Sequence, residues 1–94
     1  MGEKIPLFKK HKNKLPVDTD LNSVTEEGIY IIASAQKIVN APLGINKTAM
    51  VTLIVVDYVN YGNNHQFTQN VICGNTMFTR EFVSSWTAWL KIGV

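Results

Sequence analysis

Hydrophobic and polar residues alternate along much of the second half of the chain, which is typical of half-buried β-strands. In the clearest stretch Phe67, Val71 and Cys73 fall on one side, and Thr68 and Asn70 fall on the other. Segments rich in β-branched and aromatic residues predict five strands, at residues 29–33, 50–58, 66–73, 76–82 and 86–92.

The segments between these strands carry turn signals. Residues 39–45 contain a proline and a glycine and predict a loop, and residues 61–64 predict a turn. Gly74-Asn75 places glycine first in a two-residue connection, which favours a tight hairpin. The apolar run within residues 50–58 is nearly continuous, so we expect both faces of that strand to be covered.

One short helix is predicted just before the first strand. Asp18 and Asp20 can each cap it, and Ser23 and Glu26 have the spacing of a capping box. Gly28 suits the left-handed position that ends a helix. The predicted fold is mainly β, a small antiparallel meander of about five strands with the short N-terminal helix packed on it. An α+β fold is the alternative.

Size and charge divide the chain into an arm and one domain. Residues 1–14 contain five lysines and one acid, whereas the rest has four basic and six acidic residues. We interpret residues 1–16 as a basic arm or linker, expected to be poorly ordered, and residues 17–94 as a single domain. No apolar run reaches the length of a spanning helix or of a signal peptide, so we expect neither membrane insertion nor export.

Residues for catalysis or metal binding are sparse. The two histidines, His11 and His65, lie at no metal-ligand spacing from the single cysteine or a carboxylate. Asp57 and Glu81 lie on strands that can be neighbours, and paired carboxylates are the groups that a glycosidase uses. The leading interpretation is nevertheless a protein without catalytic residues, metal or cofactor.

Two kinds of binding are considered. A nucleic-acid-binding protein that uses the lysines of the arm is the alternative function, because lysines neutralise phosphates. The predicted sheet argues against nucleic acid, since Arg80 is the single basic residue near its aromatic side chains. Sugar sites combine aromatic faces with amides, and one turn gathers such residues. The candidate ligand residues are Tyr58, Asn60, Tyr61, Asn63, Asn64 and His65.

The last strand contains both tryptophans. Regular alternation would place Trp86 against the core with Leu90, and Trp89 on the opposite face beside Lys91. The pair is therefore interpreted as part of the core and not as a flat ligand platform. The predicted core residues are Tyr30, Leu53, Val55, Phe67, Phe78, Trp86 and Trp89.

Four short motifs, in this order, resemble the pyocin-knob type of domain. They are Asp20-Leu21-Asn22, Gly28-Ile29-Tyr30, Asn40-Ala41-Pro42 followed by Gly44, and Trp86-Thr87-Ala88-Trp89. The resemblance covers residues 18–92. The family usually has an arginine-bearing strand before the first tryptophan, which Thr79-Arg80 keeps, and a glycine-rich turn, which residues 82–85 replace.

The resemblance implies a function in bacteriophage tails. Pyocin-knob domains occur in tail fibres and receptor-binding proteins of bacteriophages and of phage-tail-like bacteriocins. The chain would then be a non-enzymatic structural or adhesive module that contributes to host-surface recognition or fibre architecture. Its partners would be other tail-fibre or baseplate proteins and cell-surface glycans, its parent protein a homotrimer. Its location would be the virion, after synthesis in the cytoplasm of the bacterial host.

Overall fold

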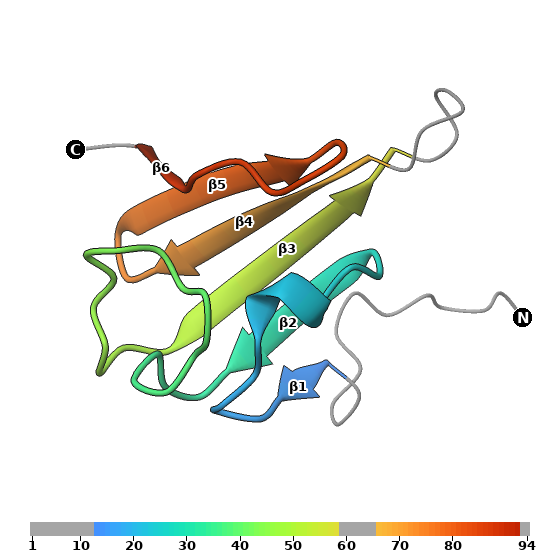
Figure 1. Ribbon diagram of the computed structural model, residues 1–94. Helices are drawn as coiled ribbons and strands as arrows, with labels where there is room; N and C mark the ends of the chain where they lie inside the picture. The colour runs from blue at the N-terminus through green and yellow to red at the C-terminus, as the bar shows by residue number, and fades with distance from the viewer. Residues whose placement is uncertain (1–12, 59–65, 93–94) are drawn as a thin grey trace, which may run out of the picture.

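The chain passes back and forth through one six-stranded β-sheet, and the strands lie in the sheet in chain order (Figure 1). The computed structural model describes residues 13–58 and 66–92. β1 pairs parallel with β2, and each later pair is antiparallel. The strands are β1 Lys14–Leu15, β2 Gly28–Ile32, β3 Val51–Asp57, β4 Phe67–Cys73, β5 Thr76–Phe82 and β6 Leu90–Ile92. The fold is therefore mainly β, an antiparallel meander extended by one short parallel strand.

The predicted N-terminal α-helix is not seen, and a single 3-10 turn, η1 (Leu21–Ser23), takes its place. Asp20 caps this turn, because its Oδ1 accepts a hydrogen bond of 2.9 Å from the backbone N–H of Asn22. Val24 already leaves helical geometry, with φ −97° and ψ 86°. One turn fixes several dihedrals for few hydrogen bonds, so an α-helix does not propagate from it. No helix in the described part of the chain is long and apolar enough to cross a membrane.

β1 comes from the segment that the sequence assigned to the basic arm. Lys14 and Leu15 pair with Ile31 and Ile32, and the carbonyl of Asn13 accepts a 2.8 Å bond from the N–H of Ile31. The described part of the sheet thus begins two residues before Pro16, ahead of the boundary expected at residue 17.

The core lies on one face of the sheet. The side chains of Val51, Leu53 and Val55 on β3 are at most 1% exposed. The turn η1 and the long connection between β2 and β3 lie over this face (Figure 1). They contribute further buried residues, among them Leu21 and Ile45.

We expected both faces of β3 to be covered, but the described residues cover only one of them. Residues of β3 alternate between buried and half-buried, so only every second side chain reaches the core. The continuous apolar run was misleading because it does not distinguish a two-sided strand from one whose outer positions are also apolar. β4 alternates in the same way along its whole length.

The segment between β5 and β6 departs from the regular strand that the sequence predicted. Regular pairing with β5 is confined to Leu90–Ile92, and Trp86 forms only an isolated bridge with Phe82. Alternation therefore does not apply between the two tryptophans, and both reach the same side chain, Arg80. The prediction that they lie on opposite faces is wrong for this reason.

Candidate functional site

The site is built around a polar pair within the core face of the sheet. Gln69 on β4 and Arg80 on β5 lie directly opposite each other, in the row that also contains Val55 and Gly28. Gln69 is fully buried and Arg80 is 7% exposed. Burying an amide and a charge is costly unless both are hydrogen-bonded, so their partners decide whether the fold tolerates them.

Gln69 connects the sheet to the turn η1. Its Nε2 donates to the carbonyls of Leu21, at 2.6 Å, and Val24, at 2.8 Å. The carbonyl of Leu21 also accepts a 3.2 Å bond from the N–H of Val24, so the Gln69 amide adds a second donor there and supplies a partner to the carbonyl of Val24 at the end of the turn. The Oε1 of Gln69 accepts a 2.9 Å bond from Nε of Arg80.

Arg80 is held by hydrogen bonds and by aromatic rings. One terminal nitrogen donates to Oδ1 of Asn22 at 2.8 Å. The guanidinium carbon lies 3.9 Å from the ring centroid of Trp86 and 4.4 Å from that of Trp89. Both distances are within the range of cation–π attraction, which is strongest for tryptophan and for a desolvated cation. The two tryptophans therefore replace part of the hydration that burial removes.

Asn40 links Asp20 and Trp89 through two hydrogen bonds. The side-chain amide of Asn40 donates to Oδ1 of Asp20 at 2.7 Å, and the backbone carbonyl of Asn40 accepts a 3.0 Å bond from Nε1 of Trp89. Asn40 adopts a positive φ of 63°, a conformation that asparagine tolerates better than most residues. We call Asp20, Asn22, Asn40, Gln69, Arg80, Trp86 and Trp89 the Arg80 cluster.

The electrostatics of the cluster follow from these contacts. Burial lowers the pKa of Arg80 to about 10, while the carboxylate of Asp20 acts in the opposite direction. Arg80 therefore remains protonated at neutral pH. The hydrogen bonds from Asn40 and from the backbone of Asn22 lower the pKa of Asp20, and Arg80 adds to that effect.

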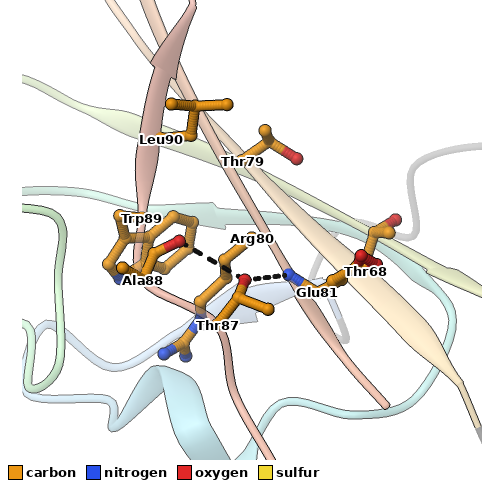
Figure 2. A pocket seen from close by; sticks show the side chains of 8 residues that line it. All are labelled: Thr68, Thr79, Arg80, Glu81, Thr87, Ala88, Trp89 and Leu90. Carbon is orange, nitrogen blue, oxygen red and sulfur yellow. Dashed lines mark hydrogen bonds between the residues drawn. The ribbon is translucent and has the colours of Figure 1, made fainter.

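A hollow of about 430 Å³ adjoins the cluster where β5 and β6 separate (Figure 2). Thr87 is one of the residues that line it: its hydroxyl accepts a 3.0 Å bond from the N–H of Glu81 and donates to the carbonyl of Ala88. Hydroxyls, one carboxylate and one indole can contact a small polar molecule. The lining residues are Thr68, Thr79, Arg80, Glu81, Thr87, Ala88, Trp89 and Leu90.

Most of the predicted ligand turn lies outside the described residues. This applies to Asn60, Tyr61, Asn63, Asn64 and His65. Tyr58 is described: it is 37% exposed, and its N–H donates to the carbonyl of Gln66 at 2.7 Å.

The two acids considered as a carboxylate pair are not brought together. Asp57 aligns with Phe67 on the core face, whereas Glu81 aligns with Thr68 on the opposite face. Among residues 13–58 and 66–92, no group of three or more histidine, cysteine or acidic side chains is arranged to hold a metal ion.

The residues predicted for the core occupy three kinds of position. Leu53, Val55, Phe67 and Phe78 are buried. Tyr30 and Trp89 are partly buried and pack against the core cluster. Trp86 is half-buried and meets Phe67 and Phe82 edge-on, with centroids 5.4 and 5.2 Å apart.

Sequence reasoning did not find the Arg80 cluster as a unit. A signal was present, because Gln69 alternates with Phe67 and Val71, and Arg80 alternates with Phe78, all at core-facing positions. A polar residue at the apolar period of a strand needs a buried partner. The pattern does not say which distant segment provides it.

Comparisons with known proteins add no relative. No protein-family model, no curated protein and no solved structure matches the chain.

Proposed function

We propose that the chain is a non-enzymatic structural or adhesive module of a tail fibre or receptor-binding protein from a bacteriophage, a prophage or a phage-tail-like bacteriocin. In this proposal the module belongs to a homotrimeric parent protein in the virion tail or baseplate. There it contributes to fibre architecture or to contact with glycans on the host surface.

One observation carries the proposal: the motifs that resemble the pyocin knob meet in space. Asp20 and Asn22 of the first motif, Asn40 of the third and both tryptophans of the last belong to the Arg80 cluster. Gly28 of the second motif lies in the same register row as Arg80. Motif residues that recur in a family because they stabilise its fold are expected to lie close together in space. Their proximity here supports the assignment to the pyocin-knob type.

The chemistry of the cluster favours a structural role over a catalytic one. Arg80 uses its donors and its ring contacts to join β4, β5, η1 and the C-terminal segment. Within the described residues every buried side-chain nitrogen and oxygen has a hydrogen-bond partner. Such a satisfied network rigidifies a domain, which suits a module exposed at the end of a fibre.

The location of the parent protein tests the proposal. Phage or tail-like particles are purified from the source strain, analysed by mass spectrometry, and labelled with gold-conjugated antibody against the chain. We expect peptides of the chain in the particles and label at the tail tip. A capsid or sheath protein and an abundant host cytoplasmic protein serve as positive and negative purification controls. Absence of the chain from intact particles would contradict the proposal.

Binding to host cells tests the adhesive part separately. A fluorescent fusion of the full chain is mixed with host cells before and after periodate oxidation of surface glycans. We expect binding that periodate abolishes and that Tyr58→Ala weakens. Leu43→Ala is the matched control, because Leu43 is 95% exposed and lies in another loop. Particle-associated protein that does not bind cells would leave the architectural role and exclude the adhesive one.

A further inference from the structure

The sheet has a second face that is unusually apolar. Residues directly opposite each other on paired strands point to the same side, so the register identifies this outer face. Its apolar members are Ile29, Ile31, Ile54, Val56, Ile72, Met77, Leu90 and Ile92. Its polar members are Lys14, Thr52, Thr68, Asn70, Thr79 and Glu81.

No described segment buries the outer face. None of its residues is buried, whereas their neighbours on the core face reach 0–5% exposure, and Leu90 and Ile92 are 65% and 44% exposed. An antiparallel sheet with one face in water normally carries polar residues there. Domains are built from at least two packed layers, so an apolar face of this kind is suited to receive a second layer.

The polar groups at the centre of the outer face are already satisfied within it. The hydroxyl of Thr79 donates to Oδ1 of Asn70 at 2.9 Å, and the amide of Asn70 donates to the carbonyl of Ile54 at 3.3 Å. Covering these side chains therefore leaves each of the two with a hydrogen bond, which reduces the penalty for burying polar groups.

The size of the face corresponds to a stable interface. Seven residues of β3 extend about 23 Å, and six strands span about 24 Å across the sheet. The flat footprint is on the order of 500 Å², and side-chain corrugation brings the accessible area toward the roughly 800 Å² that each partner buries in a standard interface.

The charges of the outer face complement each other under two-fold symmetry. Lys14 lies on β1, in the row of Ile31, and Glu81 lies on β5, in the row of Val56 at the other end of the strands. They occupy opposite corners. A two-fold axis along the other diagonal places each Lys14 over the Glu81 of a second copy, with the strands crossing near a right angle. Orthogonal packing of this kind is one of the two common arrangements of stacked sheets.

We propose that the outer face packs against the outer face of a second copy of this chain in a two-fold dimer. The proposal does not rest on the tail-fibre function, because it rests only on the register, exposure and charges of the sheet. In a homotrimeric parent protein, the two copies of each pair would belong to different trimers. The apolar residues supply the driving force, and the Lys14–Glu81 pairs select the orientation.

Sedimentation equilibrium of the full 94-residue chain, from about 1 to 100 µM, tests the proposal. We expect the mass of a dimer at the upper concentrations. Leu90→Glu places a charge on the apolar face and should raise the dissociation constant at least about tenfold. Leu43→Glu is the matched control, since it makes the same change at a 95% exposed position outside the face, and should leave the constant unchanged.

Charge reversal tests the orientation and replaces Leu90→Glu if that variant does not fold. Lys14→Glu and Glu81→Lys should each weaken the dimer, and the double variant should restore it. Circular dichroism verifies folding of each variant. A monomeric or trimeric mass at every concentration overturns the proposal. This holds whatever else covers the outer face. A dimer insensitive to Leu90→Glu, or unrestored by the double reversal, also overturns it.

Discussion

At the scale of single residues, the side chain of Gln69 links three parts of the fold through its hydrogen bonds. Its amide satisfies two carbonyls of the η1 region and positions the guanidinium of Arg80. An aliphatic side chain of similar length fills the same space but supplies none of these bonds. Removing one partner of a buried group costs more than the bond itself contributes, because the remaining group stays dehydrated.

We therefore expect Gln69→Met to lower the free energy of unfolding by about 3 kcal/mol. Urea unfolding at neutral pH, followed by tryptophan fluorescence, measures the change. Gln36→Met is the matched control, because Gln36 is exposed, and it should stay within about 0.5 kcal/mol of the parent. Equal stability of the two variants would mean that Gln69 is not the link between sheet and turn.

Asp20 makes stability depend on pH at the acid end. Its hydrogen bonds lower its pKa in the folded state below the ordinary value of 3.8. Its contribution is therefore fully present above pH 3.8 and is lost as the pH falls through the folded-state pKa. Asp20→Asn keeps an oxygen that can cap the turn but has no titratable group. The difference in free energy of unfolding between parent and variant should therefore shrink as the pH falls from 3.8 through the folded-state pKa of Asp20. Unfolding curves recorded across this pH range measure the gap, and a gap that stays constant would contradict the role.

At the scale of elements, the β4–β5 hairpin depends on one backbone conformation. Gly74 has a φ of 65° in the two-residue turn that joins the strands. Side chains with a Cβ rarely adopt this region, and no atom lies near enough to Gly74 for crowding to matter. Strain in the backbone is thus the only cost of a methyl group here.

Gly74→Ala should destabilise the fold by about 1 kcal/mol, measured by thermal or urea unfolding. Asn75→Ala is the control within the same turn, because Asn75 has a negative φ, and we expect it to have a smaller effect. If alanine is harmless at both positions, the left-handed conformation of Gly74 does not constrain the hairpin.

At the scale of the whole molecule, stability should decrease from the centre of the sheet to its edges. β3 and β4 have strands on both sides, whereas β1 and β6 are edge strands of two and three residues. Amide hydrogen exchange reports the free energy of local opening. We expect the slowest exchange in β3 and β4 and the fastest in β1 and β6. Exchange in β6 as slow as in β3 would contradict this order, unless a covering partner protects the edge.

The sequence by itself determined the features that depend on local periodicity. The positions of β2 to β5, the core-facing residues of β4 and the Gly74-Asn75 turn follow from alternation and from the freedom of glycine, which act over a few residues. The mainly β class follows from them. The η1 region was misjudged because capping residues start a turn without providing the packing that extends it into a helix.

Only the tertiary structure decided what surrounds Arg80 and which face of the sheet no described segment covers. The hydrogen bond from Arg80 to Asn22 joins residues 58 positions apart, and no local pattern encodes such a distance. The irregular path before β6 brings Trp86 and Trp89 to one guanidinium, although alternation separates them. The apolar run of β3 is likewise compatible with a strand covered on one face and with a strand covered on both. The two cases differ in which other segments pack against the sheet. Periodicity specifies the elements, whereas the partners of buried charges and the covering of faces are set by how distant elements pack.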